Sequence, residues 1–79
     1  MYVWNEAKRK SNLEKHGLDF KDAYLVYESP DKCTYDASRS DESRLMDVAI
    51  AVIRGRVLTL IYTERDGNVR VISFRHASR

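Results

Sequence analysis

The segment RVLTLIYTERDGNVRVISFRH, residues 56–76, decides the fold of this 79-residue chain. Its two halves are rich in valine, isoleucine, leucine, threonine and aromatic residues, which favour strands. Asp66-Gly67-Asn68 separates the halves, and an Asp-Gly pair between two such runs is typical of a tight hairpin turn. The segment therefore predicts two antiparallel strands over residues 56–65 and 69–76.

A third strand is predicted immediately before this hairpin, over residues 44–53, where the composition is similar. Arg54-Gly55 would join it to the next strand, so that the three strands form an antiparallel meander. Residues 1–4 are expected to add a strand at an edge of the sheet. Residues 31–43 are polar and loop-like, and a short strand around residues 33–35 is left open.

Two helices are predicted in the first part of the chain. The first runs from about Asn5, a good N-cap, to about His16, with Gly17 just past its end. The second starts at Asp19, with Asp22 as an approximate capping box, and ends at residues 29–31. Its core-facing stripe follows helical spacing and consists of Phe20, Ala23, Tyr24 and Tyr27.

These elements predict one α+β domain over residues 1–79, in the order β-α-α-β-β-β, with both helices on one face of a three- to four-stranded antiparallel sheet. Alternation assigns the apolar face to Leu58, Leu60, Tyr62, Ile72 and Phe74, joined by Met46, Val48, Ile50 and Val52. The opposite face would carry Thr59, Thr63, Arg65, Ser73 and Arg75, with Asp47, Ala49 and Ala51 from the first of the three strands. This polar face either is simply solvated or serves a function.

Composition limits the classes of protein. The chain has no apolar run of membrane-spanning length and no signal peptide at Met1. Cys33 is the lone cysteine, which fits a reducing, cytoplasmic setting. The net charge is only +2, but residues 1–17 and 53–79 are basic and residues 18–52 are acidic. The two basic ends either form one surface for an anionic polymer or are scattered solvated charges.

Polar groups cover most of the surface of the first predicted helix. Trp4, Lys8, Ser11, Asn12, Lys15 and His16 fall within one arc of roughly 140° that holds no carboxylate. Lys15 and His16 also occupy the last turn, where the helix dipole favours cations. The arc therefore either handles an anion or belongs to a largely solvated helix.

Ordered motifs along almost the whole chain resemble the BrnT family of type II toxin–antitoxin toxins, small bacterial ribonucleases of the RelE-like fold class. They are Trp4-Asn-x-x-Lys8, Asn12-x-x-Lys15-His16-Gly17, Phe20 with Ala23, Asp36 before Arg44, Arg56-Val-Leu, Tyr62-Thr63-x-Arg65 and Arg70-Val-Ile-Ser73-x-Arg75 with Ala77. The resemblance also implies a C-terminal helix beyond Ala77. The chain ends at Arg79, so we expect that helix to be absent.

The resemblance implies RNA cleavage without metal or cofactor, in which the 2′-hydroxyl of the RNA attacks the adjacent phosphorus. Such an enzyme needs proton-transfer groups and cations around the phosphate. The candidate catalytic residues are His16, Arg65, Arg75 and Lys15. The candidate RNA-binding residues are Lys8, Arg9, Arg56 and Arg70. His16 equally fits a role in capping its helix, and His76 is a weaker candidate for proton transfer.

The implied partners are RNA and a ribbon-helix-helix antitoxin of the BrnA kind. The complex would bind operator DNA, with a toxin dimer within it, and the free toxin would inhibit translation. Two alternatives stay open. The chain could be a non-catalytic RNA- or ribosome-binding module, or a protein whose basic surface serves only an acidic partner.

Overall fold

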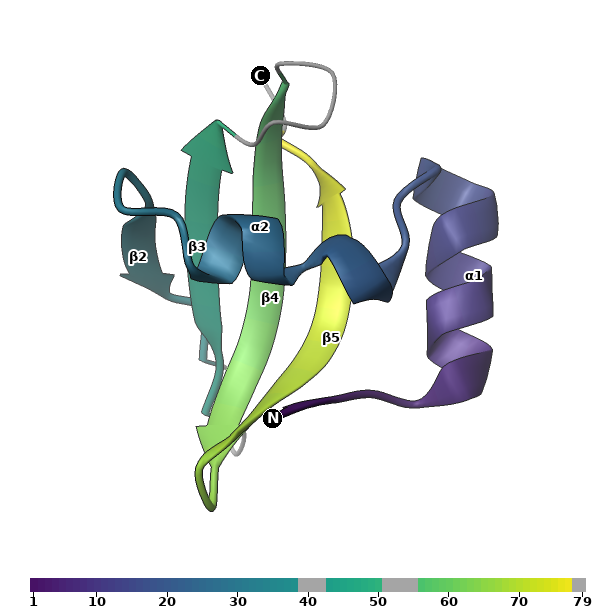
Figure 1. The fold of residues 1–79 in the computed structure, drawn as a ribbon, viewed down its shortest axis with the longest axis horizontal. Coiled ribbons are helices and arrows are strands. Elements are labelled where there is room, and N and C mark those ends of the chain that lie inside the picture. The colour runs from purple at the N-terminus through teal and green to yellow at the C-terminus, as the bar shows by residue number, and fades with distance from the viewer. Residues whose placement is uncertain (39–42, 51–55, 78–79) are drawn as a thin grey trace.

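The computed structural model describes residues 1–38, 43–50 and 56–77. Its elements are β1 (Tyr2–Val3), α1 (Glu6–His16), the 3₁₀-helix η1 (Phe20–Asp22), α2 (Tyr24–Tyr27), β2 (Cys33–Asp36), β3 (Leu45–Ile50), β4 (Val57–Arg65) and β5 (Asn68–His76). The α+β class is as predicted, and the predicted order β-α-α-β-β-β is extended by the strand β2 between the helices and the meander (Figure 1). The predicted turn at Arg54-Gly55 and the predicted positions of Ala51 and Val52 lie outside the described residues.

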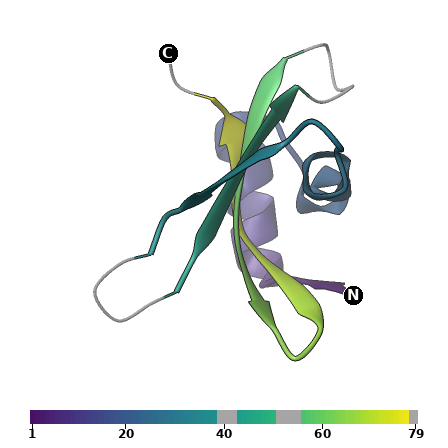
Figure 2. The ribbon, with the colours of Figure 1, turned by 90° about the vertical axis from the view of Figure 1, so that its left-hand side faces the viewer.

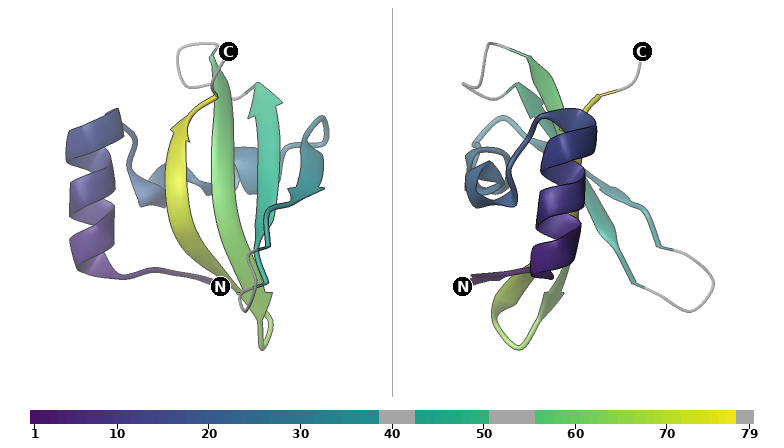
Figure 3. Two further views of the ribbon diagram at one scale, coloured as in Figure 1. Left: turned by 180° about the vertical axis from the view of Figure 1, so that it is seen from behind. Right: turned by 90° about the vertical axis from the view of Figure 1, so that its right-hand side faces the viewer.

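The sheet has five strands in the order β1-β5-β4-β3-β2. The prediction of a three- to four-stranded, purely antiparallel sheet is therefore wrong. The short segment β2 forms a full edge strand paired with β3, and β1 pairs in parallel with β5. α2 covers one face of this mixed sheet, and no described helix covers the other, which we call the open face (Figure 2; Figure 3, left).

The predicted hairpin turn is confirmed between β4 and β5. Arg65 pairs with Asn68, so Asp66 and Gly67 form a two-residue turn. Both have positive φ, 54° and 77°, as the type I′ turn requires. Gly67 meets this requirement without strain, and aspartate is among the residues that tolerate it.

α1 stands along the β5 edge of the sheet rather than on its apolar face (Figure 1; Figure 3, right). Both predicted ends of the helix are confirmed. Asn5 Oδ1 accepts a hydrogen bond from the Lys8 backbone N–H, and Gly17 adopts a left-handed conformation with φ 71°. The expectation that both helices pack on the apolar face holds only for the second helical segment.

A buried asparagine explains how so polar a helix docks. Asn12 is the buried residue of α1, and β1 pairs only with the start of β5, at Val69 and Arg70. Further along β5, Asn12 Nδ2 donates to the Phe74 carbonyl at 2.6 Å, and Phe74 N–H donates to Asn12 Oδ1 at 3.2 Å. Nδ2 also donates to the Leu18 carbonyl at 3.0 Å. Asn12 thus satisfies the backbone groups of Phe74 on the side of β5 that faces away from β4, beyond the part paired with β1.

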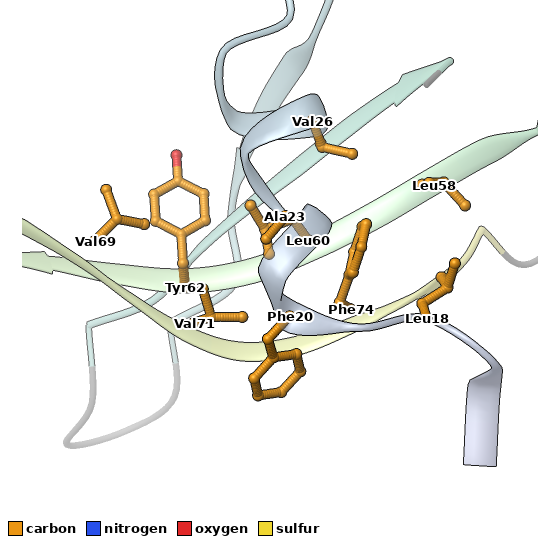
Figure 4. Close-up of a cluster of buried hydrophobic side chains, with 10 residues drawn as sticks. All are labelled: Leu18, Phe20, Ala23, Val26, Leu58, Leu60, Tyr62, Val69, Val71 and Phe74. Atoms are coloured by element: carbon orange, nitrogen blue, oxygen red, sulfur yellow. The ribbon is translucent and has the colours of Figure 1, made fainter. Parts of the chain in front are cut away.

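The core lies between the sheet and the segment from Leu18 to α2 (Figure 4). The second helix is split into η1 and α2, with Asp19 as N-cap accepting from Lys21 N–H rather than forming a box with Asp22. The split changes the buried stripe. Phe20 and Ala23 are buried as predicted, but Val26 is buried where Tyr24 was expected, and Tyr24 is 45% exposed.

Two assignments of sheet faces are wrong, each for a reason of register. A bulge makes Ile61 pair with Ser73 but Tyr62 with Val71, so the extra residue Ile72 does not share the core face with Tyr62. The core residues of β5 are instead Val69, Val71 and Phe74. In β3, Leu45 pairs with Tyr62 and Asp47 with Leu60, which places Asp47 on the core face and Met46 on the open face. The side chains of Val48, Ala49 and Ile50 lie outside the described part.

Asp47 is completely buried and fully partnered. It accepts hydrogen bonds from Lys32 Nζ at 2.6 Å, Thr34 Oγ1 at 2.7 Å and Tyr62 OH at 3.0 Å. Lys32 also lies over the Tyr27 ring, 4.2 Å from its centroid. These contacts fasten β2 and the segment before it to the centre of the sheet, because a buried carboxylate needs charged and hydroxyl partners.

Candidate functional site

A groove of about 500 Å³ lies where α1, β3, β4 and β5 come together. Its polar lining comes from the first half of α1, the start of β3, the end of β4 and the start of β5. The lining residues are Lys8, Ser43, Arg44, Leu45, Thr63, Glu64, Arg65, Arg70 and Ile72. The volume is within the range of sites that hold a small ligand or part of a polymer. We call it the basic groove.

The basic groove has cationic walls. In the described ranges, residues 1–38, 43–50 and 56–77, no carboxylate lies within ion-pair distance of Lys8, Arg65 or Arg70. The one carboxylate bordering the groove belongs to Glu64, and it accepts a hydrogen bond from Tyr27 OH of α2. This bond turns the Glu64 carboxylate towards the α2 side of the sheet. It also raises the pKa of Tyr27 to about 12.

The groove lies on the open face because of the strand alternation. Leu60 and Tyr62 of β4 face the core, so Thr63 and Arg65 face the other way. Thr63 pairs with Arg70 of β5, and cross-strand partners share a face. The predicted placement of Arg65, Thr63, Ser73 and Arg75 together on the polar face agrees with this register.

The candidate residues fall into two groups at opposite ends of the sheet. Lys8, Arg65 and Arg70 meet at the groove. The other group lies at the opposite end, where the last turn of α1 stands beside the end of β5 (Figures 1 and 3). It comprises Lys15 and His16 of that turn, Arg75 near the end of β5 and Arg56 just before β4. Lys15 is about 10 Å along the helix axis from Lys8, at 1.5 Å per residue. The fold therefore does not bring His16 to the groove.

Arg9 is engaged within the protein. Its guanidinium contacts Glu6 at 2.7 Å and Asp19 at 3.1 Å, and its side chain is only 13% exposed. The Arg9 bonds hold the pKa of Glu6 down to about 2. Arg9 thus links the first turn of α1 to the N-cap of η1. His76 pairs with Leu58 on the core side, and its Nδ1 is buried with no hydrogen-bond partner in the described part of the chain.

Sequence reasoning missed Arg44 and Ile72 as groove residues. Arg44 stands just before β3, and the register Leu45–Tyr62 brings it beside Thr63. Its position depends on the pairing of β3 with β4, and the sequence analysis had assigned Met46 and Asp47 of β3 to the wrong faces. Ile72 reaches the groove only because of the bulge, for which the sequence holds no clear signal.

The site can bind a phosphate-rich ligand. Arginine presents a planar fork suited to phosphate, and lysine adds a point charge. The open position of the groove, with an exposed sheet face beside it, suits an extended polymer better than an enclosed small molecule. No described helix is both long and apolar enough to cross a bilayer.

Comparison with known proteins agrees with this chemistry. The chain matches, over residues 4–79, the family described as "Ribonuclease toxin, BrnT, of type II toxin-antitoxin system". No curated protein sequence matches the chain.

Proposed function

The chain belongs to the BrnT family of type II toxin–antitoxin ribonuclease toxins, and on that premise we propose that it is a metal-independent endoribonuclease that binds and cuts RNA in the basic groove. The observation that carries the proposal is the convergence of Lys8, Arg65 and Arg70, from three separate elements, without carboxylate partners in the described part of the chain. Such a cluster repels itself unless an anion binds, and a phosphodiester is the anion that RNA offers.

The proposed reaction uses the 2′-hydroxyl of the RNA. Its oxygen attacks the adjacent phosphorus, the bond to the 5′-oxygen breaks, and the products carry a 2′,3′-cyclic phosphate and a 5′-hydroxyl. The proton of the 2′-hydroxyl passes to water, and the leaving 5′-oxygen takes a proton from the Lys8 ammonium. Arg65 and Arg70 stabilise the extra negative charge on the phosphate in the transition state.

The second group of cations receives a different role in this proposal. Arg75 lies on the same open face as Arg70, five residues further along β5, and Lys15 lies on the same side of α1 as Lys8. Together with Arg56 and His16, they would hold nucleotides flanking the scissile phosphate. Arg9, being paired with Glu6 and Asp19, would act on RNA only by positioning α1.

The test is a cleavage assay with purified protein in EDTA and an end-labelled RNA. We expect cleavage with a 2′,3′-cyclic phosphate end, and no cleavage where a single 2′-deoxynucleotide replaces the reacting one. Cleavage of the deoxy-substituted site would refute the 2′-hydroxyl mechanism. Tight RNA binding without any cleavage would instead favour a non-catalytic RNA- or ribosome-binding module.

The family also implies an antitoxin partner. We propose that this partner is a ribbon-helix-helix protein that neutralises the toxin, and that the complex contains a toxin dimer and binds operator DNA. Free toxin would cut RNA in the cytoplasm and so inhibit translation. Co-expression with its antitoxin should restore growth, and the mass of the purified complex should correspond to two copies of each chain.

A further inference from the structure

Tyr35 is an exposed aromatic residue on the open face, outside the basic groove. It lies on β2 and is 52% exposed. It pairs with Met46, which pairs with Ile61 of β4. Ile61 lies between the core residues Leu60 and Tyr62, so it points to the open face, and its cross-strand partners point the same way. The neighbouring Thr34 bonds to the buried Asp47, which confirms that Tyr35 faces away from the core.

The register places Tyr35 next to the row of residues that lines the groove. Tyr35, Met46, Ile61 and Ser73 form one row across four strands, and Arg44, Thr63 and Arg70 form the adjacent row. Two residues along a strand span about 7 Å, and neighbouring strands are about 4.8 Å apart. Arg70 on β5 is three strand spacings, about 14 Å across the sheet, from Tyr35 on β2. The base that extends over the half-buried Met46 and Ile61 to the Tyr35 ring therefore belongs to a neighbouring nucleotide of the strand whose phosphate binds in the groove.

Most other aromatic side chains in the described ranges already have partners. Tyr2 and Tyr27 donate to Glu28 and Glu64, and Tyr27 also stacks edge-on against both Tyr2 and Tyr62. Trp4 and Phe20 form a further edge-on pair. Tyr24 is nearly as exposed as Tyr35, but it lies on α2, across the sheet. Tyr35 makes no hydrogen bond or ring contact within the described part of the chain.

We propose that Tyr35 is a stacking platform for a nucleobase of single-stranded RNA whose backbone lies in the basic groove. The inference rests on the proposed function, because the groove must hold RNA phosphate for the base to reach the ring. A cationic track beside an aromatic ring on an open sheet face is a common way to bind single strands. A duplex keeps its bases stacked inside the helix, so the platform selects unpaired RNA.

The experiment measures the affinity of an uncleavable 2′-O-methyl oligonucleotide by fluorescence anisotropy. Stacking of one base on an aromatic ring corresponds to about a 5- to 150-fold loss of affinity when the ring is removed. We therefore expect that loss for Tyr35→Ala and less than about a twofold change for Tyr35→Phe, which keeps the ring. Tyr24→Ala is the matched control, since it removes a similarly exposed ring from the other side of the sheet, and it should leave affinity unchanged.

An oligonucleotide of the same length without bases separates stacking from other effects. Tyr35→Ala should not weaken its binding, whereas Arg70→Ala should weaken binding of both oligonucleotides and lower the salt dependence by about one phosphate contact. An equal loss for Tyr35→Ala on both oligonucleotides, or no loss on either, would overturn the stacking proposal. This binding assay is independent of the cleavage assay, so the two proposals can fail separately. If only Arg70→Ala loses affinity, RNA binds in the groove but Tyr35 is not a stacking platform. If Tyr35→Ala shows a base-dependent loss but the protein cuts no RNA, the platform stands and the proposed enzyme activity is rejected.

Discussion

Replacing Asn12 by alanine tests how α1 is attached to the sheet. The substitution removes three hydrogen bonds, to the Leu18 carbonyl and to both backbone groups of Phe74. Each bond contributes about 1 kcal/mol net, and the backbone groups left behind are partly shielded from water. We therefore expect a loss of about 3 kcal/mol in the free energy of unfolding. In a domain of this size, that loss lowers the Tm by roughly 12–24 °C.

The assay is urea unfolding followed by circular dichroism, with Ser11→Ala as control. Ser11 is the exposed neighbour on the same helix, and its replacement should change stability by less than about 0.5 kcal/mol. Asn12→Asp keeps the shape but cannot donate to the two carbonyls, so it should be at least as destabilising as alanine. A loss below about 1 kcal/mol for Asn12→Ala would refute the view that this side chain completes the β5 edge.

Three further predictions concern buried and titrating groups. Asp47→Asn breaks the buried contact with Lys32 and should cost about 2–4 kcal/mol in urea unfolding, whereas a neutral result would mean that water replaces the contact. The hydrogen bond to Glu64 raises the pKa of Tyr27 to about 12, so the folded state favours the neutral phenol. This stability is present below pH ~10 and is lost as the pH rises to about 12, and Tyr27→Phe should flatten that alkaline limb. The Arg9 contacts lower the pKa of Glu6 to about 2, so its contribution is present above pH ~4.3 and is lost as the pH falls towards 2. Acid titration of Glu6→Gln should therefore show a shallower loss, and an unchanged acid limb would contradict the assignment.

Much of the fold could be predicted because local signals act over a few residues. The Asp66-Gly67 turn and the Gly17 stop each depend on a positive φ, which few residues adopt. The Asn5 cap depends on a short side chain whose oxygen accepts a hydrogen bond from the Lys8 N–H. The parallel pairing of β1 with β5 and the position of α1 could not be read in this way. They depend on contacts between distant residues, such as Asn12 with Phe74, 62 positions apart.

The candidate site was predicted in composition but not in geometry. The sequence pattern singled out Lys8, Arg65 and Arg70 with five other residues, and the fold separates these three from His16 and Arg75. The separation depends on strand register and on the position of α1 alongside β5 (Figure 1). A shift of one residue in β3 exchanges all of its side chains between the two faces, and this is why Asp47 was placed on the wrong face.

The most direct test of the central claim compares two lysines of α1 in the RNA cleavage assay. Lys8 and Lys15 are both exposed and lie on the same side of the helix, two turns apart, but only Lys8 lines the groove. We predict that Lys8→Ala lowers kcat/KM at least about 10-fold, because it removes charge stabilisation and a proton from the transition state. Lys15→Ala should lower it no more than about twofold, as expected for a contact with a flanking phosphate. Equal losses in the two variants, or a larger loss for Lys15→Ala, would contradict the placement of cleavage in the basic groove.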